Sequence, residues 1–311
     1  MTASEDVALG AEGLRMRYGA TDVLHGVTFQ VRRGEVVALL GPNGAGKTTT
    51  IEILEGFRMR SAGWAEVLGT DPAHGSEQWR ARIGIVLQSW RDHGRWRVHE
   101  LLAQLGSYYA CYSTELVARP WDVDELIAAV GLSGCADKKV KMLSGGQRRR
   151  LDVAIGLVGH PELLFLDEPT AGFDPQARCE LHDLLLRLTR QDQTTILLTT
   201  HDLGEAEKLA QRILILNRGQ IIADGTAGEL ARKIAGQDEV RWTRDGERFA
   251  QSTSDATKFV FGLFRQHGEA IADLDVRRAS LEDTYLSLVH QAESGSIEGA
   301  ETNQEKEKVA R

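Results

Sequence analysis

Short apolar runs alternate with longer amphipathic stretches through the first two thirds of the chain. Three of these runs are continuously apolar and then end in polar residues: EVVALLG at 35–41, ELLFLDEP at 162–169 and TTILLTTH at 194–201. A strand that is apolar throughout is expected where both faces of a sheet are covered. The pattern predicts an α/β domain built around a mainly parallel sheet.

The spacing becomes helical between about residues 98 and 142. Leu101, Leu102 and Leu105 recur on one helix face, and a second apolar group at 126–132 has the same period. This spacing predicts a helical subdomain, about residues 98–155, inserted into a sheet domain that spans residues 1–230.

The last third of the chain predicts a smaller and then a less ordered part. A strand-like run at 239–242, an apolar stripe at 259–264 and an alternating run at 272–276 indicate a small α+β accessory domain over 231–290. Residues 291–311 are rich in Glu, Lys, Gly, Ser and Ala and hold no aromatic residue, which predicts a disordered tail.

Composition excludes several classes of protein. The chain has 311 residues, 42% of them hydrophobic, which is enough for a folded core, and its net charge of -8 argues against nucleic-acid binding through bulk positive charge. No apolar run is long enough to cross a bilayer, and MTASEDVALG lacks the features of a secretory signal, so a cytoplasmic location is expected. The three cysteines are far apart and no histidine pair has metal-ligand spacing, which predicts free thiols and no transition-metal site.

The stretch GPNGAGKT follows the first apolar run. It fits the pattern G-x-x-x-x-G-K-[ST] directly after a predicted strand, which is the context of a phosphate-binding loop. Glycine permits backbone conformations that turn N–H groups toward an anion, and the following helix adds its positive end. We expect the lysine to reach the β- and γ-phosphates and the Thr48 hydroxyl to ligate Mg²⁺. The residues expected to contact the nucleotide here are Gly41, Pro42, Asn43, Gly44, Ala45, Gly46, Lys47, Thr48 and Thr49.

Two acidic residues end the second apolar run. Asp167 falls at the C-terminal edge of the predicted parallel sheet, where ligands of such folds bind. We expect Asp167 to hold Mg²⁺, directly or through water, and Glu168 to orient or deprotonate the attacking water. Two acids after a strand are by themselves more often a helix cap, but the phosphate loop in the same chain favours the catalytic interpretation.

A more specific pattern lies in MLSGGQRRRLDVAIGLVGHPELLFLDEP. Its stretch LSGGQ, Leu143 to Gln147, resembles the signature motif of the ATP-binding cassette (ABC) proteins. A hydroxyl and two glycines at a helix start form a second anion site. The resemblance implies a head-to-tail homodimer, in which the signature of one subunit closes over the ATP held by the other. The signature residues expected to contact nucleotide are Ser144, Gly145, Gly146 and Gln147.

Four further residues match motifs of this family in order. Tyr18 matches the aromatic residue that stacks on adenine, and Gln88 matches the glutamine that touches Mg²⁺ or water and signals to the membrane partner. Asp174 matches the aspartate of the loop that crosses the dimer interface, and His201 matches the histidine that contacts the γ-phosphate. Each match alone is a weak signal, and their shared order carries the assignment.

The resemblance covers roughly residues 6–230. It implies a P-loop NTPase fold with an ABC-type RecA-like core and an antiparallel β subdomain, and an ATPase that uses ATP and Mg²⁺. The compact space between the phosphate loop and the signature, with one cassette on the chain, resembles the ATPase subunits of membrane transporters. Such a subunit is peripheral on the cytoplasmic face of the membrane, and its integral membrane permease is a separate chain.

The end of the accessory domain resembles one subfamily. ADLDVRRASLEDTYLSLV at 272–289 is similar to the ending of exporter ATPases of the daunorubicin-resistance type, and Phe173 stands where many cassettes have leucine. The resemblance implies export of drug- or lipid-like compounds, although residues 281, 285 and 288 also fit the packing face of an amphipathic helix. The alternative is a soluble ABC ATPase that acts as a regulatory or interaction protein without transport.

The segment SWRDHGRWRVHELL departs from the usual exporter pattern. It contains Trp90, Trp96 and several arginines in the region that meets the partner's coupling helix in this family. Aromatic residues and arginines suit such an interface. A solvated basic loop is the alternative.

Overall fold

The computed structural model of the chain describes residues 6–86, 93–170, 173, 175–191, 193–235, 238–244, 247–253 and 255–277. The chain divides into two compact units, Met1–Ile221 and Ile222–Arg311, and each is described by itself. The predicted domain limits at 230 and 290 stay predictions. Gln88, Trp90 and Asp174 lie outside the described residues, as do the tail at 291–311 and the end of the exporter-like stretch, 278–289.

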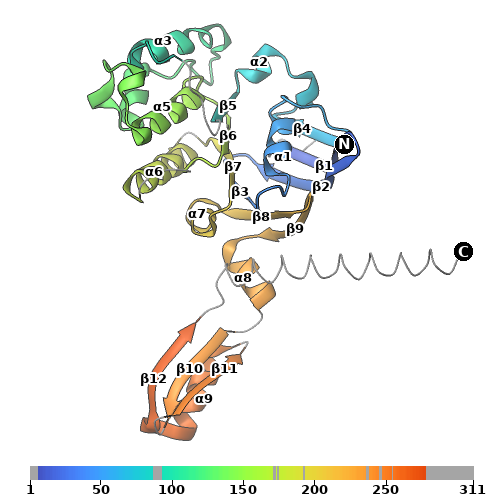
Figure 1. Ribbon diagram of the computed structural model, residues 1–311, viewed down its shortest axis with the longest axis vertical. Helices are drawn as coiled ribbons and strands as arrows, with labels where there is room; N and C mark the ends of the chain where they lie inside the picture. The colour runs from blue at the N-terminus through green and yellow to red at the C-terminus, as the bar shows by residue number, and fades with distance from the viewer. Residues whose placement is uncertain are drawn as a thin grey trace, which may run out of the picture. The chain divides into compact units, whose positions relative to one another are not determined.

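The first unit begins with a three-stranded antiparallel sheet in the order β2-β1-β4. Strands β1 (Val7–Tyr18) and β2 (Thr21–Arg32) form a hairpin, and β4 (Ala62–Val67) pairs with the other edge of β1. This is the antiparallel β subdomain that the resemblance implied (Figure 1).

A six-stranded sheet in the order β5-β6-β7-β3-β8-β9 forms the centre of the first unit, and its last strand, β9, continues into the first residues of the second unit. Its strands are β3 (Val36–Leu40), β5 (Ile83–Val86), β6 (Leu163–Asp167), β7 (Thr195–Thr200), β8 (Arg212–Asn217) and β9 (Gln220–Gly225). The first five strands in the sheet order, β5, β6, β7, β3 and β8, pair in parallel. The three continuously apolar runs are β6, β7 and β3, side by side in the middle of the sheet and almost wholly buried. The prediction of a mainly parallel, doubly covered sheet is confirmed.

The helices of the first unit gather on both sides of this sheet. They are α1 (Lys47–Leu54), α2 (Glu77–Arg80), α3 (Val98–Ser107), α4 (Val123–Ala129), α5 (Gly145–Leu157), α6 (Pro175–Gln191) and α7 (Leu203–Leu209). In Figure 1, α3 and α5 lie on the side of the parallel sheet away from α1 and the antiparallel sheet. The buried faces of α3 and α4 carry Leu101, Leu102, Leu126 and Ile127, so the helical interpretation of this region is confirmed.

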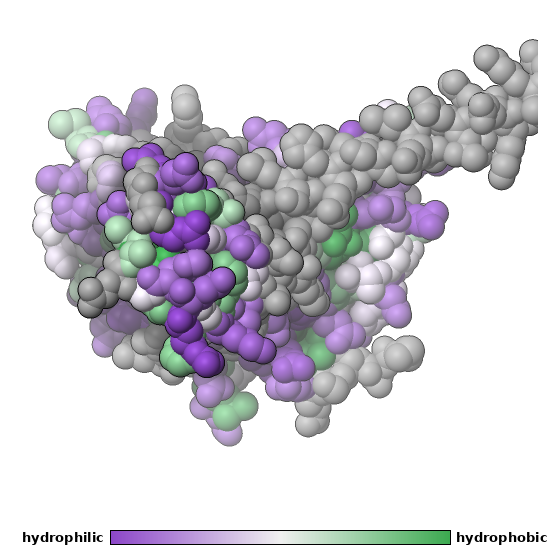
Figure 2. All heavy atoms as spheres, turned by 90° about the horizontal axis from the view of Figure 1, so that it is seen from below, coloured by the Kyte–Doolittle hydropathy of each residue, from purple (hydrophilic) through white to green (hydrophobic). Residues whose placement is uncertain are grey.

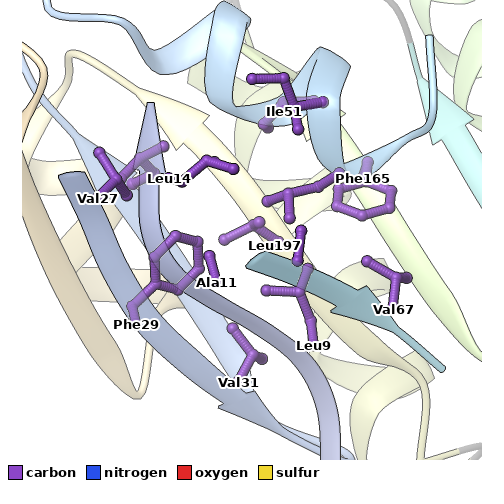
Figure 3. Packing of buried hydrophobic residues seen from close by; sticks show 14 of the residues in the cluster. Leu9, Ala11, Leu14, Val27, Phe29, Val31, Ile51, Val67, Phe165 and Leu197 are labelled. Atoms are coloured by element: carbon purple, nitrogen blue, oxygen red, sulfur yellow. The ribbon is translucent and has the colours of Figure 1, made fainter. Parts of the chain in front are cut away.

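The main hydrophobic core lies between the two sheets. Figure 3 shows apolar side chains of β1 and β2 facing Phe165 of β6 and Leu197 of β7, with Ile51 of α1 beside them. Full burial of one such side chain contributes about 1.5–3 kcal/mol. Helix α1, which follows the phosphate loop, is therefore anchored on a densely packed base.

The second unit contains the helix α8 (Ala227–Ala235) and a small α+β fold. Strands β10 (Asp238–Arg244), β11 (Glu247–Thr253) and β12 (Ile271–Arg277) pair antiparallel in the order β11-β10-β12, and α9 (Ala256–His267) packs on them. Trp242 stacks on Phe249 with ring centroids 5.5 Å apart and lies 5.7 Å from Phe259. The predicted small α+β piece is present.

The surface shows mixed character where it is described. Figure 2 presents a face on which polar and charged side chains surround small apolar patches. Across the described ranges, no helix combines the length and the apolar character that a membrane span requires.

Candidate functional site

The predicted phosphate loop connects β3 to α1. A Cβ atom at Gly41 would lie 2.2 Å from the carbonyl oxygen of Leu216 in β8, so only glycine fits this close approach. Gly44 and Gly46 have φ angles of 81° and 105°, in the left-handed region that favours glycine. Gly46 is also the N-cap of α1, so the free N–H groups of the first helical turn begin where the loop ends.

A cavity of about 420 Å³ opens over the loop. Its lining comes from the loop, the start of α1, the end of β6 and one residue of β2: Val23, Asn43, Gly44, Gly46, Lys47, Thr48, Thr49, Asp167 and Glu168. The structure therefore brings most of the predicted phosphate-binding residues and both predicted acids to one place. Gly41, Pro42 and Ala45 shape the loop without lining the cavity.

Lys47 is held at the base of this cavity. Its Nζ atom donates hydrogen bonds to the carbonyl oxygens of Gly41 at 2.7 Å and Pro42 at 3.2 Å, and it lies 4.0 Å from Oε1 of Glu168. Burial lowers the pKa of Lys47, whereas the charges of Glu168 and Asp167 raise it. The ammonium group thus lies between the loop carbonyls and the Glu168 carboxylate.

The two acids at the end of β6 are fixed by β7. The Thr199 hydroxyl donates to Oδ1 of Asp167 at 2.5 Å, and the Glu168 N–H donates to the hydroxyl and the carbonyl oxygen of Thr199 at 3.1 Å and 3.2 Å. Glu168 has a φ of 46°, which is unusual for a residue other than glycine. Such backbone strain concentrates at functional sites. Thr199 was not predicted, because only the sheet register places it opposite Asp167.

His201 stands at the rim of the site, directly after β7. Its Nδ1 atom is 3.1 Å from Oε1 of Glu168, and its side chain is 61% exposed. The imidazole is therefore close to the predicted catalytic carboxylate and open to a ligand that enters from solvent.

The signature residues lie at the start of α5, apart from the lining of this cavity. Ser144 caps the helix: its hydroxyl accepts from the Gln147 N–H at 3.3 Å, and the Gln147 side chain accepts from the Ser144 N–H at 3.1 Å. A Cβ atom at Gly145 or Gly146 would meet open space, which leaves this helix start accessible. Gln147 therefore has a capping role in addition to the contact expected of it.

Tyr18 ends β1 and is 39% exposed. The Arg58 guanidinium lies over its ring, 4.9 Å from the centroid, and Arg58 Nε donates to Glu52 of α1 at 2.6 Å. Tyr18 does not line the cavity over the phosphate loop. No sequence motif predicts this role of Arg58, because the contact joins two distant segments.

Arg149 is a third residue, after Thr199 and Arg58, that the sequence motifs do not predict. It lies in α5, is 7% exposed, and donates to carbonyl oxygens at the end of β6. In the sequence it is the middle residue of Arg148–Arg150, and nothing in that run distinguishes the buried arginine from its neighbours.

The cavity offers oxygen ligands for a hard cation. The Thr48 hydroxyl and the Asp167 carboxylate both line it. Mg²⁺ prefers oxygen ligands, keeps several water molecules and needs only one or two groups from the protein, so these residues fit it. Gln88, the third predicted ligand, is outside the described residues.

Comparison with known proteins places these features in a family. Residues 24–171 match the protein family described as ABC transporter. The chain is 40% identical over 307 residues to the daunorubicin resistance ATP-binding protein DrrA3 of Streptomyces coeruleorubidus, covering 91% of this chain and 96% of that protein. It is 42% identical over 233 residues to the Nod factor export ATP-binding protein I of Ralstonia nicotianae, covering 75% of this chain and 71% of that protein. A solved ATP-binding subunit of an ABC transporter is 26% identical with a TM-score of 0.64, covering 90% of this chain and 99% of that chain.

Proposed function

The chain belongs to the ATP-binding proteins of ABC transporters and hydrolyses ATP, and on that premise we propose that it drives export of drug- or lipid-like compounds. The extent of the likeness supports this proposal. The daunorubicin-resistance relative matches 91% of the chain, so the match continues past Ile221 into the second unit. The second relative is named for Nod factor export. Similarity that was confined to the nucleotide-binding unit would not support a role in export.

The cavity residues have complementary roles under this proposal. Lys47 and the N–H groups at the start of α1 bind the phosphates, while Thr48 and Asp167 hold Mg²⁺. When bound, Mg²⁺ neutralises the negative charge of the phosphates. Tyr18 stacks on adenine, as the family motif implies.

Glu168 acts on the attacking water. The water oxygen bonds to the γ-phosphorus, the bond from that phosphorus to the bridging oxygen breaks, and ADP and inorganic phosphate are formed. The carboxylate orients the water and accepts its proton. His201, 3.1 Å from Glu168, holds the carboxylate and contacts the γ-phosphate.

A second surface completes the nucleotide site in a dimer. Ser144, Gly145 and Gly146 stand at the open start of α5 and do not line the cavity of their own subunit. This separation supports a head-to-tail homodimer in which each signature covers the ATP of the other subunit. Gln88 and Asp174 have the roles that the family motifs imply, toward the permease and across the dimer interface.

Export needs a path through the membrane, and in ABC transporters the ATP-binding proteins pair with a permease that provides it. We propose that the chain is peripheral on the cytoplasmic face of the membrane and binds an integral permease on a separate chain. The aromatic residue Trp96, which is 39% exposed, belongs to the segment proposed to meet that permease.

The test is to purify the tagged full-length chain from detergent-solubilised membranes of its native cell and to reconstitute the complex in vesicles. We expect a stoichiometric membrane protein with several spans, and ATP-dependent accumulation of a drug- or lipid-like compound inside inside-out vesicles. Glu168→Gln in the same complex is the matched control and should abolish accumulation. A chain that carries no membrane protein would favour the regulatory alternative.

A further inference from the structure

The start of α5 and the end of β6 are joined by one buried side chain. Arg149 donates from Nε to the carbonyl oxygen of Pro169 at 3.0 Å, and from Nη2 to the carbonyl oxygens of Asp167 and Glu168 at 3.2 Å each. A planar guanidinium with a fixed fork of donors can hold several acceptors at once, which a lysine ammonium cannot do in the same geometry. Three consecutive backbone carbonyls are therefore held by one rigid group.

The turn that Arg149 holds is the turn that sets the direction of the Glu168 carboxylate. Glu168 has a φ of 46°, and a residue with a side chain keeps such a conformation only where its surroundings impose it. Thr199 of β7 binds the N–H group of Glu168, and Arg149 of α5 binds its carbonyl oxygen. The backbone of Glu168 is thus fixed from both sides, by two elements that come from different parts of the chain.

The position of Arg149 also links this turn to the signature. Helix α5 runs from Gly145 to Leu157 with Ser144 as its N-cap, so Arg149 lies little more than one helical turn after Ser144. The helix is a rigid element, and a movement of its first turn is passed directly to Arg149. Burial lowers the pKa of Arg149, while the charges of Asp152, Asp167 and Glu205 raise it, and an arginine stays protonated in proteins.

We propose that Arg149 is a positioning residue that couples the signature helix to the catalytic turn. It holds the backbone of residues 167–169 so that Glu168 faces the phosphate cavity, and it transmits the position of the first turn of α5 to that carboxylate. The inference rests on the proposed role of Glu168 as the residue that acts on water. It adds a route by which the signature of a subunit influences hydrolysis in its own cavity.

The experiment compares the full-length protein with Arg149→Met and Arg149→Lys. Methionine is similar in length and fills the buried volume without donors, and lysine keeps the charge but reaches fewer carbonyls. We expect Arg149→Met to lower kcat by about 10–100-fold, because a misplacement near 1 Å costs about that much, while the Kd for MgATP changes less than about threefold. Arg149→Lys should have an intermediate kcat.

The matched control is Arg150→Met, which removes the next arginine of the same helix and its ion pair with Glu180. We expect its kcat and its Kd for MgATP to stay within about threefold of the wild type. A general loss of packing would instead change kcat and Kd together, in both variants. If Arg149→Met does not fold, as judged by thermal unfolding, then Arg149→Lys decides: a wild-type kcat for it would overturn the proposal.

Glu168→Gln separates failure of this inference from failure of the proposed function. If Glu168→Gln loses hydrolysis while Arg149→Met keeps a wild-type kcat, only the coupling through Arg149 is wrong. If Glu168→Gln itself keeps a wild-type kcat, the role of Glu168 is wrong, and the coupling is rejected together with it.

Discussion

The two ends of strand β6 carry the same residue type in opposite situations. Glu162 lies just before the strand and Glu168 just after it. Glu162 accepts from Arg82 at 2.8 Å and 2.9 Å, from Arg119 at 3.2 Å and from Arg33 at 3.5 Å. Glu168 has Lys47 at 4.0 Å and His201 at 3.1 Å, and a strained backbone.

The difference shows how one sheet separates stability from chemistry. Burial raises the pKa of Glu162, but the hydrogen bonds of Arg82 and the charges of Arg82, Arg119 and Arg33 outweigh it and hold the pKa below its usual value. That carboxylate is fully engaged in joining distant segments. Glu168 has fewer partners and lines the cavity, so its oxygens are available to a water molecule. A glutamate is thus held by arginines at the start of the strand, whereas the glutamate at its end can interact with a water molecule.

The largest effect should come from removing the charge at the active end. We expect Glu168→Gln to lower kcat by about 10²–10⁴-fold while ATP still binds and holds the protein as a dimer, because the amide cannot accept the proton. Single-turnover ATPase assays, ATP-binding titrations and size-exclusion chromatography with ATP measure the three outcomes. Wild-type turnover would remove Glu168 from its role and end the contrast between the two ends of the strand.

The next effect should come from the other end of the strand. We expect Glu162→Gln to lower the free energy of unfolding by about 2–3 kcal/mol, because the Arg119 side chain, 2% exposed, loses its carboxylate partner. Denaturant unfolding measures this loss, and the Kd for MgATP should be unchanged. Asp22→Asn, which breaks the exposed pair with Arg17, is the control and should leave the denaturant midpoint nearly unchanged. Equal midpoints for the two variants would contradict the stabilising role of Glu162.

A third glutamate, Glu55, sharpens the comparison. Within the described part of the chain it forms no ion pair with an arginine, and it does not line the cavity. Glu55, at the C-cap of α1, is 6% exposed, and burial, with the charges of Asp167 and Glu52, raises its pKa to about 8. The folded protein thus binds a proton that the unfolded chain, with a pKa of 4.5, has lost. The contribution of protonated Glu55 to the free energy of unfolding is therefore fully present below the unfolded pKa of 4.5, and it is lost as the pH rises from there toward 8.

The variant Glu55→Gln should remove this pH dependence. Relative to wild type, we expect it to gain about 2 kcal/mol in the free energy of unfolding at pH 7 and much less at pH 5. Denaturant unfolding at the two pH values gives the difference directly. A gain that is the same at both pH values would show that Glu55 does not titrate in this range.

The smallest effect concerns the residue that fixes both acids. We expect Thr199→Val to lower kcat by about tenfold, because valine has the same shape but loses the hydroxyl that binds Asp167 Oδ1 and the Glu168 N–H. The Kd for nucleotide without Mg²⁺ should stay the same, which isothermal titration measures. The control is Thr195→Val at the start of the same strand, for which we expect wild-type kcat. An equal fall in both variants would assign the effect to the strand rather than to the acids.

The central strands and the phosphate loop could be predicted because their signals are local. Val36–Leu40 is apolar throughout, and the loop motif follows it without a gap. The alternation of apolar and polar residues did not predict strand β1. Its register shifts several times and Gly13 has a φ of 58°, and these irregularities interrupt the period of two. The resemblance, and not the periodicity, predicted that sheet.

The supporting residues of the site could not be predicted for a different reason. Thr199, Arg149 and Arg58 act through contacts between segments far apart in the sequence, which exist only once register and packing are set. Single residue types give no sign of such contacts. The residues expected to contact the ligand belong to sequence motifs, whereas the residues that hold them in position do not.

The position of β3 in the sheet has a consequence for the newly made protein. Its neighbours are β7 and β8, and the Gly41 turn rests against Leu216 of β8. A chain emerging from the ribosome thus carries the complete phosphate-loop sequence long before the strands that shape it are synthesised. We expect nascent chains that end before Arg212 to lack the ability to bind ATP. Nucleotide binding therefore cannot stabilise the early folding intermediates and stabilises only the completed sheet.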